Sequence, residues 1–311
     1  MKFYFAPLDG VTGFIYRNAF AKFFGGPDKY FAPFISPCHN PKLKGKEIKD
    51  LLPENNHSDI YLVPQIMANN PEYFIKGAKQ VAEMGYQEVN LNAGCPSGTV
   101  VSKGRGAGFL KDTYLMNQFF DEIFSKLDMK ISVKTRIGLM DAGEFEEIMD
   151  VYNKYPFEEV IVHPRTRVQL YQGTPDMNAF QYAYEHSKNS LCYNGNIFTV
   201  EDYKNISSQY CLDSIMLGRG LLRNPNLVNE IKDNQVKALS KEVIRQFHDR
   251  IYEDFKEEMS SDKHLLNKMI EMWNYLSFLS KDQHKCAKII RKAQNVYKYE
   301  CGVDKIFEEF M

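Results

Sequence analysis

The feature that most constrains the fold is a regular alternation of short apolar runs with helical patterns, which continues from the first residue to about Glu230. The predicted strands are Lys2–Ala6, Tyr30–Ile35, Ile60–Met67, Gln87–Ala93, Lys130–Arg136, Glu159–His163, Leu191–Tyr193 and Ser214–Leu217. Eight strands with helical crossovers in about 230 residues predict a closed (β/α)8 TIM barrel, in the α/β class. A doubly wound sheet is the alternative, and it is disfavoured because no strand is followed by G-x-G-x-x-G.

The pattern changes from about Gln235, after which no further strand is predicted. Polar caps followed by apolar periodicity indicate helices over Leu239–Met259, Asp262–Leu279, Gln283–Tyr299 and Val303–Phe310. We therefore predict two domains, a catalytic barrel of residues 1–234 and a small all-helical bundle of residues 235–311.

Composition excludes several classes of protein. The formal net charge of -1 provides no global attraction to nucleic acid, so any polyanion site must be a local patch. The six cysteines include no C-x-x-C pair, which argues against a zinc site and a disulfide framework. No apolar run approaches the length of a membrane span. We expect a cytoplasmic protein with no metal and no membrane contact; the oligomeric state stays open.

The stretch from Gln87 to Leu110 carries the strongest functional pattern. Its strand alternates apolar residues with two amides, Asn90 and Asn92, and Cys95-Pro96 follows at the carboxyl end. The next loop is rich in glycine and carries two cations, Lys103 and Arg105. Free cysteines are usually small buried hydrophobes, and we accept that interpretation for the other five. For Cys95 these neighbours favour a proton donor held over a flat substrate.

In the strand Lys130–Arg136, Ser132, Lys134 and Arg136 share one face. The other face is apolar and must lie under the helices, so Lys134 and Arg136 should point into the barrel, towards its mouth. An unpaired buried charge is costly, so Lys134 is either paired or functional. The alternative to function is an ion pair with Asp9 or Glu88.

Two turns have the composition of phosphate sites. Asn194-Gly195-Asn196 follows the seventh strand, and Gly218-Arg219-Gly220 follows the eighth. Glycines let backbone N–H groups approach an anion, and barrels commonly bind phosphate at these two loops. Two ordinary tight turns are the alternative.

Other polar residues lie in or after strands, at the strand ends around the same mouth, namely Asp9, Gln65, Asn90, Cys95, Lys134, His163 and Arg165. An amide, a lysine and a phosphate site together suit flavin mononucleotide (FMN). Gln65 would pair with the edge of the isoalloxazine, and Lys134 would stabilise negative charge on the reduced ring. His163 alone would more often be a structural histidine.

The motifs in chain order resemble those of the tRNA-dihydrouridine synthases. They are A-P-L-D-G-V-T (6–12), P-Q-I-M (64–67), V-N-L-N-A-G-C-P-S (89–97), V-K-T-R (133–136), H-P-R-T-R-V-Q-L-Y-Q-G (163–173), Y-N-G-N-I (193–197) and M-L-G-R-G-L-L-R-N-P (216–225). The N-x-G-C-P-S element is the most specific of them.

The resemblance implies an FMN-dependent oxidoreductase that uses NADPH to reduce the 5,6 double bond of specific uridines in tRNA. Cys95 matches the family's proton donor, and Asn90 matches the amide that meets the uracil. His163 and Arg165 match the basic pair at the flavin and RNA side. The FMN contacts match Pro7, Leu8, Asp9, Gln65, Lys134, Asn194, Gly195, Asn196, Gly218 and Arg219. Asn196 departs from the family, in which many members carry an acidic residue.

Two other functions stay open from the residues. One is an FMN-dependent oxidoreductase of a small molecule, as in the dihydroorotate dehydrogenases, and the other is a non-catalytic RNA-binding barrel. A basic stripe on the last domain favours tRNA, because Lys281, Lys285, Lys288 and Lys292 share one helical face. We expect the tRNA to contact Lys103, Arg105, Lys285, Lys288 and Lys292, with the lysines between Lys42 and Lys49 as an alternative docking region.

Overall fold

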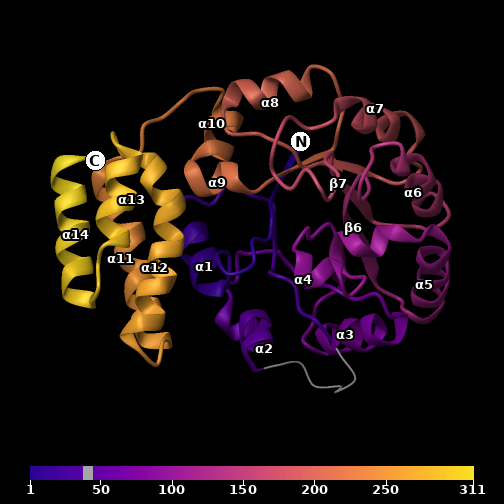
Figure 1. Ribbon diagram of the computed structural model, residues 1–311, viewed down its shortest axis with the longest axis horizontal. Coiled ribbons are helices and arrows are strands. Elements are labelled where there is room, and N and C mark those ends of the chain that lie inside the picture. Colours follow the sequence, from indigo (N-terminus) through magenta and orange to yellow (C-terminus); the bar gives the residue numbers. More distant parts are fainter. Residues whose placement is uncertain (38–44) are drawn as a thin grey trace. The chain divides into compact units, whose positions relative to one another are not determined.

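The computed structural model describes residues 1–37 and 45–311 (Figure 1). The chain forms two compact units that interleave along the sequence. The barrel unit comprises Met1–Pro7, Asp28–Asn196 and Ile206–Leu217. The second unit comprises Leu8–Pro27, Ile197–Asn205 and Gly218–Met311. The division of the sequence into residues 1–234 and 235–311 stays a prediction.

The barrel unit contains a parallel sheet of nine strands in the order β3-β2-β1-β9-β8-β7-β6-β5-β4. The strands are β1 (Lys2–Phe5), β2 (Lys29–Phe31), β3 (Leu62–Val63), β4 (Gln65–Ile66), β5 (Glu88–Ala93), β6 (Lys130–Arg136), β7 (Glu159–His163), β8 (Leu191–Tyr193) and β9 (Ser214–Leu217). The predicted TIM barrel is confirmed.

Pro64 explains why one predicted strand becomes two. Proline has no N–H for a sheet ladder, so it divides the segment into β3 and β4. β3 pairs with β2, whereas β4 pairs with β5. The Asn90 N–H still donates to the Pro64 carbonyl at 2.9 Å. The two short strands therefore join the ends of the sheet and close the barrel.

Strand register brings the predicted polar residues level with one another. Gln65 pairs with Asn90, Asn92 with Lys134, and Arg136 with His163. Because side chains alternate along a strand, these residues share one face of neighbouring strands. The opposite face of β6 lies under a helix, as Tyr152 shows by donating to Thr135 at 3.0 Å.

Four helices of the barrel unit follow one another around the outside of the strands (Figure 1). They are α3 (Pro71–Glu83), α5 (Thr113–Lys126), α6 (Glu144–Tyr152) and α7 (Met177–His186). Asn70 and Asp112 cap α3 and α5 by accepting backbone N–H groups. Three shorter segments are α4 (Gly98–Val101), η1 (Pro53–Asn55) and η2 (Gly106–Lys111).

The region of Lys42 to Lys49, named above as an alternative docking region, is partly helical. Helix α2 (Gly45–Leu51) occupies its second half, with the acidic Glu47 in the first turn of the helix and Lys49 in the last. These charges complement the helix dipole. Lys42 and Lys44 lie outside the described residues.

Part of the barrel interior is lined by apolar side chains. Its buried core cluster joins residues from six strands, Tyr4, Phe31, Val63, Ile161, Cys192 and Met216, together with Ala6. This apolar cluster contains no residue of β4, β5 or β6, where the side chains of Gln65, Asn90 and Ser132 are buried polar groups.

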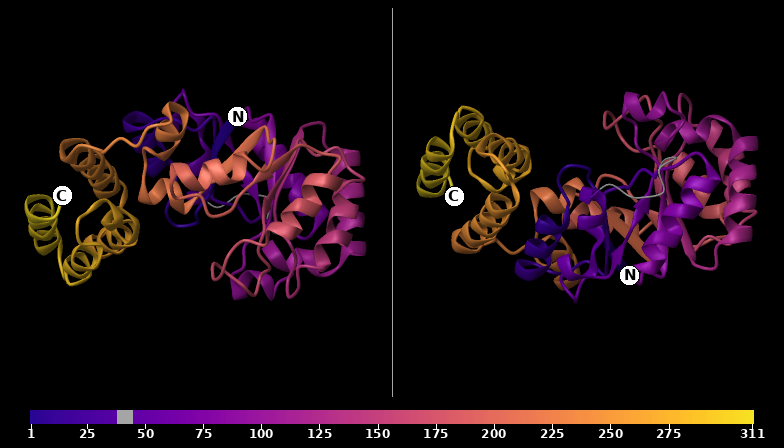
Figure 2. Two further views of the ribbon diagram at one scale, coloured as in Figure 1. Left: turned by 90° about the horizontal axis from the view of Figure 1, so that it is seen from above. Right: turned by 90° about the horizontal axis from the view of Figure 1, so that it is seen from below.

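Helices dominate the second unit. They are α1 (Phe14–Phe23), α9 (Arg219–Arg223), α10 (Leu227–Asp233), α11 (Lys241–Glu258), α12 (Asp262–Leu276), η3 (Ser277–Leu279), α13 (Gln283–Arg291) and α14 (Val296–Glu309). Helix α8 (Val200–Ser207) spans the boundary between the two units. Helices α11 to α14 lie side by side in both views of Figure 2. No helix in the described ranges is long and apolar enough to cross a membrane.

The predicted single helix over Gln283–Tyr299 is wrong. Helix α13 ends at Arg291, and α14 begins at Val296, seven residues before the predicted start at Val303. Asn295 provides the reason, because its side chain accepts the Lys298 N–H at 2.9 Å and starts a new helix.

Candidate active site

Cys95 is held by its backbone at the carboxyl end of β5. The Asn92 Oδ1 accepts the N–H groups of Gly94 at 3.1 Å and of Cys95 at 2.9 Å. On the other side, the Cys95 carbonyl accepts the Ala107 N–H at 3.0 Å. The thiol-bearing residue is half-buried. Its backbone is therefore fixed from both sides, and the residue as a whole remains partly exposed.

A glycine allows the basic loop to fold back onto Cys95. Gly106 has a φ of +55°, and a Cβ there would lie 2.7 Å from the Cys95 carbonyl oxygen. Lys103 is exposed and Arg105 is half-buried. Asn69 anchors both, because its Nδ2 donates to the Lys103 carbonyl at 3.0 Å and its Oδ1 accepts Arg105 Nε at 3.5 Å.

Three amides form a row beside Cys95. Gln65 Nε2 donates to Asn90 Oδ1 at 2.8 Å, and Asn92 Nδ2 donates to Gln65 Oε1 at 2.7 Å. Gln65 and Asn90 are fully buried, whereas Asn92 is 8% exposed. Asn92 lies two residues nearer the mouth than Asn90 on the same face of the strand. The alternation of polar and apolar residues in the sequence already indicated this position. The prediction that Asn90 meets the uracil stays a prediction.

Lys134 is half-buried on β6 and level with Asn92. Burial, assisted by the neighbouring Arg136, lowers the pKa of Lys134 from 10.5 to about 8. Among the residues of the barrel unit that the structure describes, Lys134 has no ion-pair partner. Glu88 instead binds Lys29 at 2.7 Å, so the alternative of a Glu88–Lys134 ion pair is wrong.

Arg136 joins two loops of the mouth. Its Nε donates to the Gly94 carbonyl at 2.9 Å, and its Nη1 donates to the Thr166 carbonyl at 2.8 Å. The guanidinium lies 5.4 Å from the centre of the Tyr171 ring. Burial lowers the pKa of Arg136 to about 10. We did not single out Tyr171 from the sequence, since an exposed tyrosine in a loop has no local signal.

His163 and Arg165 are brought together as expected, with Arg165 Nη1 and His163 Nε2 at 3.0 Å. Arg165 is fully buried and donates to the carbonyls of Gln172 at 3.2 Å and Gly173 at 2.6 Å. It also donates to Asn196 Oδ1 at 3.3 Å. The loop after β7 is thereby tied to the turn after β8.

The turn at Asn194 to Asn196 has a structural role. The Asn194 N–H donates to the Val162 carbonyl at 2.9 Å, and Asn194 Nδ2 donates to the Met216 carbonyl at 2.8 Å. A Cβ at Gly195 would overlap the Tyr193 hydroxyl, so glycine is required there by packing. These contacts hold the turn between β7 and β9. Its role in phosphate binding stays a prediction.

The remaining expected FMN contacts divide between the units. Pro7 is half-buried in the barrel unit, whereas Leu8, Asp9, Gly218 and Arg219 belong to the second unit. There, the Leu8 N–H donates to Thr12 Oγ1 at 2.8 Å. Gly218 immediately precedes α9, and the Arg219 guanidinium lies 5.7 Å from the Phe198 ring centre.

The predicted lysine stripe is wrong at its first member, because Lys281 precedes the N-cap Asp282 of α13; the other three lysines lie on α13 and directly after it. Lys285, Lys288 and Lys292 are exposed, whereas Cys286 and Ile290 on the same helix are buried. The Lys285 ammonium lies 4.5 Å from the Phe310 ring centre. None of the three lysines takes part in an ion pair within the described chain.

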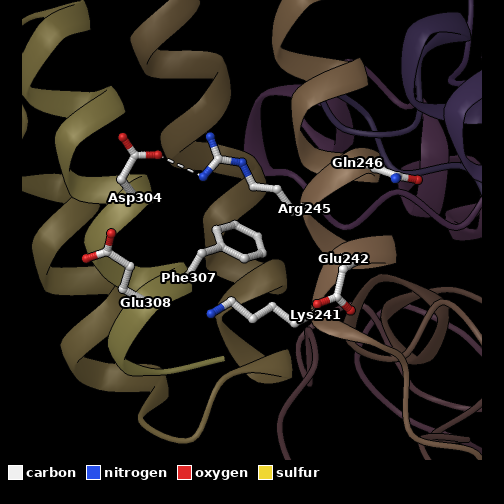
Figure 3. Close-up of a pocket in the computed structure, with 7 residues that line it drawn as sticks. All are labelled: Lys241, Glu242, Arg245, Gln246, Asp304, Phe307 and Glu308. Carbon is white, nitrogen blue, oxygen red and sulfur yellow. Dashed lines mark hydrogen bonds and ion pairs between the residues drawn. The ribbon is translucent and has the colours of Figure 1, made fainter.

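A separate pocket of about 420 Å³ lies in the second unit, between α11 and α14 (Figure 3). It is lined by Lys241, Glu242, Arg245, Gln246, Asp304, Phe307 and Glu308. Arg245 donates to Asp304 at 2.8 Å across it. Acidic and basic groups alternate around this pocket, so its lining selects no single charge of ligand. Across residues 1–37 and 45–311, no cluster of three or more His, Cys, Asp or Glu side chains could hold a metal ion.

The family comparison and the curated relatives agree on one family. The family described as "Dihydrouridine synthase (Dus)" matches residues 5–305. A "Probable tRNA-dihydrouridine synthase" of Staphylococcus aureus (strain Mu50) is 28% identical over 242 residues, which cover 72% of this chain and 69% of that protein. The "tRNA-dihydrouridine(16) synthase" of Escherichia coli O157:H7 is 30% identical over 234 residues, covering 73% and 71%.

A solved structure shares the fold at lower sequence identity. Morphinone reductase in complex with tetrahydroNAD superposes with a TM-score of 0.55 and 11% identity. The match covers 76% of this chain and 87% of that protein. At this identity the likeness extends to the barrel fold alone.

Proposed function

Because this chain belongs to the dihydrouridine synthase family, we propose that it is a tRNA-dihydrouridine synthase, an oxidoreductase that reduces the 5,6 double bond of uridines in tRNA. We propose FMN as its cofactor and NADPH as its reductant. The observation that carries the proposal is the placement of Cys95 beside Asn92, whose paired residue on the next strand is Lys134.

The donors at the barrel mouth fit a flavin. Among the described residues of the barrel unit, Lys134 has no ion-pair partner, and its lowered pKa reflects its burial and the neighbouring Arg136. Gln65 and Asn92 each use one amide N–H in the row of amides, and each amide nitrogen carries a second. Lys134 would stabilise negative charge on the ring, and Gln65 would donate to its polar edge. Pro7, Leu8, Asp9, Asn194, Gly195, Asn196, Gly218 and Arg219 are the proposed remaining contacts, with His163 and Arg165 beside them.

Cys95 is the proposed proton donor. When bound, the reduced flavin supplies a hydride to carbon 6 of the uracil. The negative charge left by hydride addition is delocalised over carbon 5 and the carbonyl at position 4 as an enolate, so carbon 5 then requires a proton. Cys95 gives this proton from the opposite face of the base and becomes a thiolate, which solvent reprotonates. A thiol acting in this way must be protonated before the reaction, in contrast to a nucleophilic cysteine.

The substrate needs both a flipped base and a wider docking surface. A stacked uridine cannot enter a barrel mouth, so it must leave the stack before reduction. Lys285, Lys288 and Lys292 are the proposed contacts to the tRNA backbone, and Lys103 and Arg105 lie on the loop beside Cys95. Asn90 is proposed to meet the uracil indirectly, since its side chain is fully buried and contacts Gln65.

The test is direct conversion of an unmodified tRNA transcript by the purified protein with FMN and NADPH. Nucleoside mass spectrometry should detect dihydrouridine, two mass units above uridine, and digestion into fragments would name the position. Nucleosides from cells lacking the gene should lose the same modification.

Failure would redirect the assignment. Flavin reduction without any tRNA product would favour an oxidoreductase of a small molecule. Binding of tRNA without flavin or product would favour the non-catalytic RNA-binding barrel.

A further inference from the structure

A continuous line of hydrogen bonds crosses the inside of the barrel from the amino end of β5 to Cys95. It starts at Glu88, the first residue of β5. One carboxylate oxygen accepts from Lys29 at 2.7 Å and from Tyr61 at 3.3 Å. The other accepts from the Ser132 hydroxyl at 3.4 Å. All three donors therefore converge on one buried carboxylate.

The line continues through side chains that are fully or almost fully buried. Ser132 Oγ accepts from Asn90 Nδ2 at 2.9 Å, and Asn90 Oδ1 accepts from Gln65 Nε2 at 2.8 Å. Gln65 Oε1 accepts from Asn92 Nδ2 at 2.7 Å. Asn92 Oδ1 then accepts the backbone N–H groups of Gly94 and Cys95. In every link the donor lies on the Cys95 side and the acceptor on the Glu88 side.

Both ends of the line require this direction. An ionised carboxylate only accepts, so Ser132 must donate to Glu88 and is left to accept from Asn90. Backbone N–H groups only donate, so Asn92 must turn its oxygen towards Gly94 and Cys95. An amide can be rotated to exchange oxygen and nitrogen, and each of the three amides alone has that freedom. Joined between these two ends, they have one orientation that satisfies every member.

We propose that Glu88 and Ser132 are positioning residues, which set the orientation of the three amides and thereby fix the backbone of Cys95. The orientation also leaves Gln65 and Asn92 with spare N–H donors instead of spare oxygens. Such donors suit a ligand that offers carbonyl oxygens, as a flavin or a uracil does. The catalytic consequence rests on the proposed function, whereas the structural consequence at Cys95 does not.

A matched pair of variants tests this proposal. Ser132→Ala removes the side-chain acceptor of Asn90 Nδ2 in the line, so the direction of the amides is then imposed from the Cys95 end alone. Ser214→Ala is the control, because Ser214 is also a fully buried serine of a barrel strand that donates to a buried glutamate, Glu159. Glu159 accepts from Tyr4 as well, and neither residue belongs to the line that ends at Cys95. Both variants remove the same atoms from the same interior.

The first measurement is amide hydrogen exchange in the purified protein. In Ser132→Ala, the N–H groups of Gly94 and Cys95 should exchange about tenfold faster relative to Leu91 in the same strand, the effect of losing about one hydrogen bond. In Ser214→Ala that ratio should keep its parent value. Equal ratios in the two variants would overturn the proposal, since a general loss of stability moves all these amides together.

The second measurement is the reduction of tRNA by the flavin-loaded enzyme. Ser132→Ala should slow the single-turnover proton-transfer step about tenfold, with KM for tRNA unchanged, while Ser214→Ala reacts at the parent rate. An unchanged rate in Ser132→Ala would overturn the catalytic part of the proposal. If the parent enzyme itself reduced no tRNA, the proposed function would fail, and the exchange ratios would still decide whether the line holds Cys95.

Discussion

Replacing Lys134 by methionine should stabilise the flavin-free protein at pH 7. Burial and the neighbouring Arg136 lower the pKa of Lys134 from 10.5 to about 8, so the folded protein disfavours the charged form. Each pKa unit corresponds to about 1.4 kcal/mol, which makes the cost of the charged lysine roughly 3 kcal/mol. Methionine keeps an unbranched side chain of similar length without the charge. For a chain of this size the gain corresponds to a Tm increase of about 5 °C.

The pH dependence gives the sharper test. Below pH 8 the lysine is protonated in both the folded and the unfolded protein, so the full cost is present. Between pH 8 and 10.5 the unfolded chain binds more protons than the folded protein, so the stability of the parent rises with pH. The advantage of Lys134→Met should therefore be largest at pH 7 and should disappear as the pH approaches 10.5.

Denaturant unfolding of flavin-free protein at pH 7 and pH 9.5 would measure the difference. Lys130→Met is a matched control on the same strand, because Lys130 is exposed and binds Glu158 at 3.0 Å. An exposed ion pair contributes little, so this control should change stability little at either pH. The reasoning is refuted if Lys134→Met is no more stable than the parent at pH 7, or if its advantage does not change with pH.

Three further predictions follow from the proposed function. The purified protein should be yellow, and acid extraction should release FMN; a different flavin, or none from folded protein, would contradict the cofactor. Cys95→Ala should still let NADPH bleach the flavin but should slow tRNA reduction by roughly two to four orders of magnitude, and parent turnover would return Cys95 to a structural role. Changing Lys285, Lys288 and Lys292 to Glu should weaken tRNA binding and lower the log–log salt slope by under one unit per lost phosphate contact, with NADPH oxidation intact. The same reversals at exposed barrel lysines should leave both quantities unchanged, the control set being Lys79, Lys126 and Lys188.

The barrel was predictable because its signals are local. Period-two alternation and the connecting helical patterns give the strands and their order, and parallel strands with helical crossovers have few ways to close. The inward face of β6 could also be read from its sequence, since an apolar face must lie under the helices. The motif around Cys95 could likewise be recognised from a continuous segment of sequence, without knowledge of its contacts with the rest of the chain.

The errors have a common physical cause. Apolar residues recur at helical spacing throughout Gln283–Tyr299, so the pattern predicts one helix. The same pattern does not indicate that the first helix ends before Asn295, which caps a second helix. The suggested Glu88–Lys134 pair failed because Glu88 lies at the opposite end of β5 from Cys95, where Lys29 on β2 reaches it. A period identifies the face on which a side chain lies, whereas its partner depends on strand order and register.

By itself, the sequence determined a parallel barrel with a helical C-terminal region, and it predicted Cys95, Gln65 and Lys134 as members of one site. Only the tertiary structure decided what those residues contact. The closure of the sheet at Pro64, the bridge from Arg136 to two loops and the line from Glu88 to Cys95 all join segments far apart in the chain. Such contacts follow from the packing of whole strands and loops, and hydrogen-bond direction is settled only when every buried donor and acceptor finds a partner at once.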